Sequence, residues 1–159
     1  MSKSLKRVKR ALESFGHSTE VRETGEARMA QMAADELEVD VDQIAKSIIF
    51  KGETTGEAIL FLTAGGNQVD VTKASDLAGE PLGKADAALV RLQTGFAIGG
   101  VSPIGHKNPI RCWIDPHLLK FEVVWAAAGT PHHVFSSTPN QLANMSGAKT
   151  ADFTVTKIM

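Results

Sequence analysis

The sequence TGFAIGGVSPIGHK, residues 94–107, carries four glycines and one proline among small and apolar residues. Glycine lets the backbone adopt positive φ and approach a ligand closely. Pro103 fixes its own φ and favours an extended Ser102. The pattern predicts a short strand, Phe96–Ile98, followed by a shaped loop that ends at Lys107. Such a loop can offer backbone N–H groups to a phosphate, a carboxylate or a carbonyl oxygen. A buried glycine turn without a ligand explains the stretch equally well.

Length and composition limit the classes of protein to consider. The chain has 159 residues, which suits one domain over residues 1–159 with its own core. Its net charge of −1 means that any nucleic-acid binding must come from a local basic patch. Cys112 is the only cysteine, so no internal disulfide can form, and we expect a reduced core residue. No apolar run has the length of a membrane span, and the basic N-terminus lacks a signal-peptide core. These features predict a cytoplasmic protein.

The first helix is expected over Ser4–Phe15, where apolar residues recur at helical spacing. Gly16 is a suitable stop for it. The first ten residues also hold a basic cluster, whose members are Lys3, Lys6, Arg7, Lys9 and Arg10. A solvated helix face is the ordinary explanation of such a cluster, and contact with the phosphates of a nucleic acid is the sharper alternative.

The remaining elements mix hairpins with helices. Helices are expected over Ala27–Leu37, Asp70–Ala78, Ala85–Gln93 and from Thr138 to Ser146, with the methionines of the first of these in the core. Strands are expected around Glu20–Arg22 and over Lys46–Gly52, Ala58–Thr63, Ile110–Ile114, Phe121–Ala127, His132–Ser136 and Phe153–Thr156. Because a regular βαβ alternation is lacking, this order predicts an α+β (mixed α/β) fold with a mixed sheet, curled or closed into a barrel.

Standard catalytic motifs are absent from the sequence, which has no GxSxG, Walker loop, HExxH or GxGxxG. His132 and His133 are adjacent, so on a strand they would point to opposite faces and could not easily share a metal ion. The isolated histidines His17, His106 and His117 are expected at the surface or in turns. Lys46 precedes an apolar strand, where a lysine is costly unless its ammonium reaches water or a partner. It is therefore either a lysine at the solvent end of the strand or a cation aimed into a pocket.

Three segments together resemble the YbaK/ProX family of aminoacyl-tRNA editing domains, which also occur as insertions in prolyl-tRNA synthetases. The first segment is DQIAKSIIF, residues 42–50, and the second is the GGVSPIG core of residues 94–107. The third joins the Asp115 turn, the FEVVWAA strand and the Gly129 turn. The likeness extends over nearly the whole chain, and the GGVSPIGHK segment is its most specific part.

The resemblance implies a curled, mostly antiparallel sheet and a hydrolase that removes a wrong amino acid from tRNA, typically tRNA(Pro). Lys46 matches the essential lysine of the family, and Gly99 and Gly100 match loop glycines that face the scissile carbonyl and the terminal adenosine. The residues that we then expect at the substrate are Ser47, Phe50, Ser102, Pro103, Gly129 and His133. No metal or organic cofactor is expected. The implied partner is an aminoacyl-tRNA, and a prolyl-tRNA synthetase is a further candidate partner.

Ester hydrolysis needs stabilisation of an oxyanion, and the N–H groups of Gly99 and Gly100 are candidates for it. Some positions depart from the family pattern. Cysteine-selective members carry a serine where Ala127 falls and an aspartate near Val134. Alanine-selective members carry a histidine that corresponds to His132 or His133, and some have an asparagine at Ser47. The sequence thus favours alanine or 2-aminobutyrate over cysteine as the edited residue. A non-catalytic tRNA- or nucleotide-binding module and a small-molecule hydrolase remain as alternatives.

Overall fold

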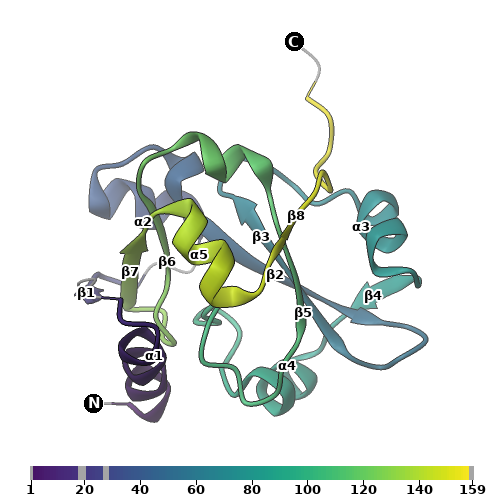
Figure 1. Cartoon of the computed structure of the whole chain (residues 1–159), viewed down its shortest axis with the longest axis horizontal. Helices are drawn as coiled ribbons and strands as arrows, with labels where there is room; N and C mark the ends of the chain where they lie inside the picture. Colours follow the sequence, from purple (N-terminus) through teal and green to yellow (C-terminus); the bar gives the residue numbers. More distant parts are fainter. Residues whose placement is uncertain (1, 18–20, 27–28, 158–159) are drawn as a thin grey trace.

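The computed structural model describes residues 2–17, 21–26 and 29–157, and its strands form two sheets (Figure 1). The larger sheet has the order β4 (Leu82–Lys84), β2 (Ala45–Gly52), β3 (Ala58–Ala64), β5 (Arg111–Ile114) and β8 (Lys149–Thr150). The smaller sheet has the order β1 (Val21–Glu23), β7 (His133–Ser137) and β6 (Val124–Ala127). The smaller sheet is antiparallel, whereas β3–β5 and β5–β8 are parallel pairs in the larger one. Within the described residues the fold is therefore mixed α+β, and neither sheet closes into a barrel.

The helices lie around these sheets. They are α1 (Lys3–Ser14), α2 (Ala30–Leu37), α3 (Val71–Ala78), α4 (Ala87–Thr94) and α5 (Pro139–Ser146), with short 3-10 helices η1 (Val41–Gln43) and η2 (Pro116–Lys120). The helix α1 and the smaller sheet lie at one end of the molecule, and α3 with β4 lies at the other (Figure 1). The predicted start and stop of α5 are confirmed, because the Thr138 hydroxyl accepts from Gln141 N–H and Gly147 follows in the left-handed conformation. Among the described residues no helix is long and apolar enough to cross a membrane.

β2 and β3 form an antiparallel hairpin, and β3 is the middle strand of the larger sheet. Every residue of β3 is buried, because its two faces pack against different clusters. Leu60 and Leu62 join a large core with Phe96, Phe135 and Leu142, whereas Ile59 and Phe61 pack on the other face. There the Phe61 ring stacks on Trp113 with their centroids 5.5 Å apart. This two-sided burial explains why β3 reads as a continuous apolar run.

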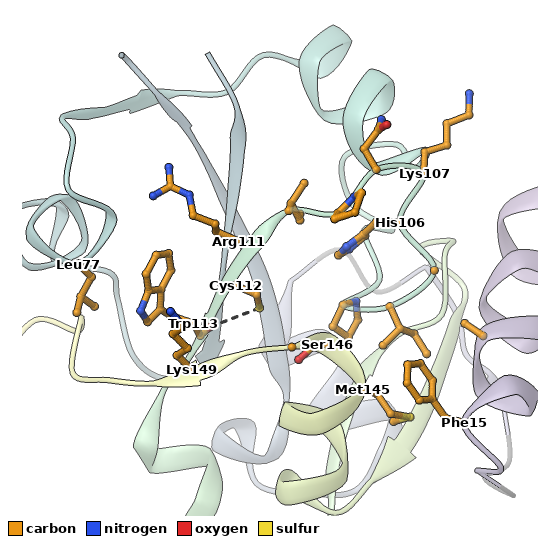
Figure 2. Close-up of a pocket in the computed structure, with 18 residues that line it drawn as sticks. Phe15, Leu77, His106, Lys107, Arg111, Cys112, Trp113, Met145, Ser146 and Lys149 are labelled. Carbon is orange, nitrogen blue, oxygen red and sulfur yellow. Dashed lines mark hydrogen bonds between the residues drawn. The ribbon is translucent and has the colours of Figure 1, made fainter. Parts of the chain in front are cut away.

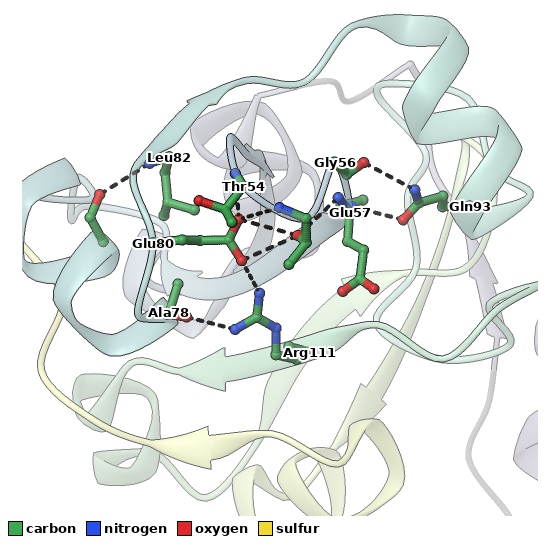
Figure 3. Close-up of polar contacts among 11 residues, drawn as sticks. Thr54, Gly56, Glu57, Ala78, Glu80, Leu82, Gln93 and Arg111 are labelled. Atoms are coloured by element: carbon green, nitrogen blue, oxygen red, sulfur yellow. Dashed lines mark hydrogen bonds and ion pairs between the residues drawn. The ribbon is translucent and has the colours of Figure 1, made fainter.

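A buried carboxylate fixes the far end of this hairpin (Figure 3). The Oε1 atom of Glu80 accepts the backbone N–H groups of Thr54 and Thr55 at 3.0 Å each, and Oε2 pairs with Arg111 Nη2 at 2.6 Å. These hydrogen bonds, the Thr55 N–H foremost, lower the pKa of Glu80. Arg111 also donates to the carbonyl of Ala78 at 2.7 Å. The hairpin turn, the end of α3 and β5 are thereby tied together, which leaves the other end of β2 for the candidate site.

Some sequence expectations are wrong. Phe96–Ile98 is not a strand, because Gly95 ends α4 in the left-handed conformation and Phe96 turns inward as a fully buried side chain under Arg7. Of Phe153–Thr156 only Thr154 pairs, in a single bridge with Val69. β6 begins at Val124 rather than Phe121. The strand β4 was not expected at all.

Three further residues, Met29, Met32 and Cys112, were expected in the core. Met29 and Met32 are 68% and 48% exposed, so they are not core residues of α2, whose predicted first residues lie outside the described part. Cys112 is confirmed as a core residue, and burial raises the pKa of its thiol to about 12, which makes a reactive thiolate improbable at neutral pH.

Candidate functional site

The candidate site is a cavity of about 730 Å³ at the place where the two sheets separate. A parallel bridge joins Ile44 to Trp125, and β2 then diverges from β6 until it pairs with β4 at Phe50–Gly52. Between these two points one edge of β2 has no neighbouring strand in the described part of the chain. The cavity lies along this edge, and its further walls are the start of α2, the loop around Gly99 and the turn after β6.

Backbone groups of β2 face this cavity. The strand β3 uses the Leu62 carbonyl to accept from Asp115 N–H at 2.8 Å, and the Ala64 N–H to donate to Asp115 Oδ2 at 3.1 Å. Leu62 and Ala64 thus use their backbone groups on the side away from β2, so each belongs to a non-hydrogen-bonded pair of the β2–β3 ladder. In such a pair the backbone groups of both residues point away from each other. Ser47, which pairs with Leu62, therefore directs its N–H and C=O groups away from β3, to the side of β2 on which the cavity lies.

Lys46 brings the cavity its ammonium group. Its Nζ donates to the carbonyl of Gly65 at 3.3 Å, and both residues line the cavity. Burial lowers the pKa of Lys46 below its ordinary value, and the negative charges of Asp42 and Asp115 oppose that shift. The ammonium has three donors and uses one on Gly65, so it can still bind an oxygen of a ligand.

Gly99 lies across the cavity from β2. It adopts φ +95°, a left-handed conformation that favours glycine, and its N–H has no partner within the described part of the chain. Gly100 has a different role, because its N–H already donates to the Ala97 carbonyl at 3.0 Å. A Cβ added at Gly100 would lie 2.8 Å from the Thr130 backbone. Of these two glycines, Gly99 therefore has the free N–H that could bind an oxyanion, while Gly100 allows the loop to pack on the turn at Thr130.

Two polar side chains on opposite walls complete the site. The Ser47 hydroxyl oxygen is buried and has no hydrogen-bond partner in the described structure. Such a buried hydroxyl is costly to leave unpaired, so it favours a polar ligand group beside it. On the other wall His133 Nδ1 lies 2.7 Å from the Thr130 hydroxyl. This contact fixes the imidazole ring and leaves Nε2 for a ligand.

Four other residues expected at the substrate do not line this cavity. The Phe50 ring packs edge-on against Phe61, with centroids 5.9 Å apart, on a different cluster. Ser102 is fully buried, and its carbonyl accepts from His106 Nε2 at 2.6 Å. Pro103 lies on a separate cavity, and Gly129 packs against the Ser4 carbonyl of α1. Ser102 and Gly129 are instead chain neighbours of the lining residues Val101 and Thr130.

The separate cavity measures about 870 Å³ and lies between β5, α5 and the loop of residues 103–109 (Figure 2). Its basic side chains are Lys107, Arg111 and Lys149, and Trp113 forms part of its wall. It contains neither Lys46 nor Gly99, and Arg111 is already paired with Glu80. Across the described residues no group of three His, Cys, Asp or Glu side chains is placed to hold a metal ion.

Other residues of the site had no clear signal in the sequence. Thr130 sits at the turn between β6 and β7, where its hydroxyl orients His133. Asp40 and Asp42 both suit the N-cap of a short helix. Asp40 is the N-cap of η1, and Asp42 instead accepts from Gly66 N–H at 2.7 Å. The second oxygen of Asp42 lies 3.0 Å from His117 Nε2, so the expectation of an isolated surface histidine at this position is wrong. These partners are 75 residues apart, and only the fold brings them together.

Comparison with known proteins decides the family. The sequence profile described as "Aminoacyl-tRNA editing domain" matches residues 24–145. The chain belongs to this family. It is 32% identical over 148 residues to an uncharacterized protein, YwhH, of Bacillus subtilis (strain 168), with 92% of this chain and 93% of YwhH covered.

Solved structures agree with this family. A protein described as a candidate trans-editing enzyme for prolyl tRNA synthetase superposes with a TM-score of 0.91 and 44% identity, over 98% of this chain and 99% of that one. A hypothetical protein, APE2540, superposes with a TM-score of 0.85 and 25% identity, over 94% and 99% of the two chains. The YbaK/ProX-like fold expected from the sequence is therefore confirmed. As a family, these editing domains remove amino acids from tRNA.

Proposed function

We propose that this editing domain is a trans-editing hydrolase that deacylates mischarged tRNA, and that the cavity between β2 and β6 is its active site. The observation that supports the proposal most is the meeting of Lys46, Gly99 and His133 on one cavity, although they come from three distant segments. A cavity of about 730 Å³ suits the aminoacyl-adenosine end of a tRNA rather than the whole molecule. The remainder of the tRNA would lie on the protein surface.

The reaction needs a water molecule, a site for negative charge and a path for one proton. Water adds to the ester carbonyl, and the developing oxyanion accepts from the Gly99 N–H and the Lys46 ammonium. The C–O bond to the ribose then breaks, the ribose oxygen takes the proton, and free amino acid and deacylated tRNA result. None of the described residues that line the cavity is a carboxylate. We therefore assign the orientation of the water to the free ribose hydroxyl of the substrate, held near its target by binding.

The walls of the cavity favour a small aliphatic amino acid. Ala127 and Val134 both line the cavity, at positions where cysteine-selective relatives of the family carry polar residues. Ala33, Ile44 and Ala126 add further apolar surface. Among the candidate residues alanine, 2-aminobutyrate and cysteine, we therefore favour alanine or 2-aminobutyrate. The likeness to the candidate trans-editing enzyme for prolyl tRNA synthetase supports tRNA(Pro) as the carrier.

The test compares the wild type with Lys46→Ala on Ala-, Cys- and Ser-tRNA(Pro), with Pro-tRNA(Pro) as the cognate reference. Wild-type protein is expected to release alanine and to spare proline. Loss of the ammonium should slow deacylation about 100-fold or more, since removal of one oxyanion-stabilising group typically costs this much. Lys51→Ala, on the exposed far end of β2, is the matched control and should keep full activity.

Circular dichroism and thermal unfolding should show that both lysine variants are folded. A folded Lys46→Ala protein that deacylates at the wild-type rate would contradict the proposed active site. If the wild type binds tRNA but cleaves none of the charged species, the protein is a non-catalytic binding module instead.

A further inference from the structure

The ammonium of Lys46 donates to a turn that hydrogen bonds to two carboxylates, Asp42 and Asp115, hold in place. The turn contains Gly65, whose carbonyl accepts from Lys46, and Gly66, whose N–H donates to Asp42 Oδ1 at 2.7 Å. Asp115 Oδ2 holds the neighbouring Ala64 N–H at 3.1 Å and the Asn67 side-chain amide at 2.8 Å. Several hydrogen bonds therefore determine where the Gly65 carbonyl points.

Asp42 is itself held in place. Its Oδ2 lies 3.0 Å from His117 Nε2, and an ionised carboxylate can only accept, so this nitrogen carries the hydrogen. The His117 backbone N–H donates to Asp115 Oδ1 at 2.9 Å, and the His117 ring packs edge-on against Phe121. The two 3-10 helices η1 and η2 thus form one polar network, and this network meets the cavity at the Gly65–Gly66 turn.

We propose that Asp42 is a positioning residue for Lys46. Held by its contact with His117, Asp42 fixes the Gly65–Gly66 turn, whose carbonyl binds the Lys46 ammonium, and it keeps a negative charge near that ammonium. The inference rests on the proposed function for its link to catalysis, but not for its geometry. Asp42 does not line the cavity, so it would act through Lys46 rather than on the substrate.

The charges around Lys46 make the role of Asp42 measurable. Asp42 on η1 and Asp115 before η2 favour the charged ammonium, whereas Lys157 near the C-terminus and burial disfavour it. His117 faces Asp42 from η2. Asp42→Asn keeps an oxygen for the Gly66 N–H but removes the charge. Since the charged form then loses support, the pKa of Lys46 must fall further below its ordinary value.

The experiment is competitive acetylation with a trace of acetic anhydride across the alkaline range, with the extent of reaction at each lysine read by mass spectrometry. In Asp42→Asn the midpoint of Lys46 reactivity should move to lower pH than in the wild type, while exposed Lys51 stays unchanged. Asp40→Asn is the matched control, because Asp40 caps η1 and asparagine is an equally good cap. It should leave the Lys46 midpoint in place.

The pH dependence of the deacylation rate is the second measurement. The alkaline limit of the rate should move to lower pH in Asp42→Asn, and Asp42→Ala, which also frees the turn, should lose on the order of 100-fold in rate through misplacement of the lysine. Asp42→Glu keeps the charge but moves the carboxylate, so it should keep the Lys46 midpoint while the rate falls.

An unchanged Lys46 midpoint in folded Asp42→Asn would overturn the inference, whether or not the protein deacylates tRNA. A shifted midpoint in a protein that cleaves no charged tRNA would support the placement of Lys46 and reject the proposed hydrolase. The two failures are therefore distinguishable.

Discussion

At the scale of single residues, the candidate site depends on glycines at which backbone segments touch. Gly100 packs against the backbone of Thr130, and Gly129 packs against the Ser4 carbonyl. Through these contacts the loop that presents Gly99 is fixed against the turn that presents Thr130 and His133. The positions of the Gly99 N–H, the candidate oxyanion donor, and of the His133 imidazole are therefore coupled by close backbone packing rather than by side chains.

Gly100→Ala tests this coupling. The new Cβ would lie 2.8 Å from Thr130 backbone atoms, so the loop must shift. We expect a rate loss on the order of 100-fold, since small displacements of reacting groups are costly. Deacylation kinetics with a mischarged tRNA measure it. Gly56→Ala is the control: it costs about 1 kcal/mol of stability because φ is +74°, but it has open space far from the cavity. Equal activity of Gly100→Ala and the wild type would refute the close-packing role.

Sequence reasoning reached some of these residues and not others. Lys46 and Gly99 were predicted because the resemblance linked a lysine before an apolar strand to a glycine-rich loop, and both line the cavity. Asp42 and His117 were missed, because an aspartate near a helix start most simply reads as a cap. Phe50 was also expected at the substrate, but its ring packs against Phe61 in a separate cluster, which neither the resemblance nor strand alternation reveals.

At the scale of elements, α1 combines a packing face with a basic face. Leu5, Val8 and Leu12 are buried, and Arg7 is used internally, with its guanidinium over the Phe96 ring and Nη1 donating to the Gly95 carbonyl at 3.1 Å. Three members of the basic cluster are exposed to solvent and lie at helical spacing: Lys3, Lys6 and Arg10. None of these three has an ion-pair partner among the described residues. The Ser4 carbonyl of α1 packs on Gly129, directly before cavity residues Thr130 and Pro131.

This arrangement predicts that α1 contacts the phosphates of a tRNA whose end occupies the cavity. Lys6→Ala combined with Arg10→Ala should weaken tRNA binding and reduce the slope of log affinity against log salt by roughly two, about one per lost phosphate contact. Binding titrations over a range of salt concentrations measure this slope. Cleavage of a short aminoacyl-adenosine ester should not change.

The matched control is Lys51→Ala combined with Lys84→Ala, which removes the same charge at the opposite end of the molecule, beside β4 (Figure 1). If both double variants reduce the salt slope equally, α1 has no special part in tRNA binding.

The elements themselves were predicted unevenly, for identifiable reasons. Helices with clear caps, such as α3 after Asp70 and α5 after Thr138, begin where their caps indicate. The hairpin β2–β3 was evident from two apolar runs and a turn. The strand β4 has only three residues, and its pairing with Phe50–Gly52 depends on contacts distant in sequence. Phe96–Ile98 has strand-like composition, but the packing of Phe96 into the core prevails over that local preference.

At the scale of the whole molecule, one glycine-rich loop separates two cavities. Gly99 and Val101 line the cavity at β2, whereas residues 103–109 line the larger cavity at Trp113. Size alone would favour the larger one. The smaller one holds the groups that the proposed ester cleavage would use: a half-buried ammonium, an open backbone N–H, and an unpaired hydroxyl on apolar walls.

The most direct measurement is therefore an experimental structure with an amide-linked alanyl-adenosine, which mimics the end of Ala-tRNA but resists hydrolysis. We expect the alanyl group between β2 and β6, with its carbonyl oxygen within hydrogen-bonding reach of the Gly99 N–H and the Lys46 ammonium. An analogue bound instead beside Trp113, Arg111 and Lys149, or bound with its carbonyl facing away from Gly99 and Lys46, would contradict this expectation.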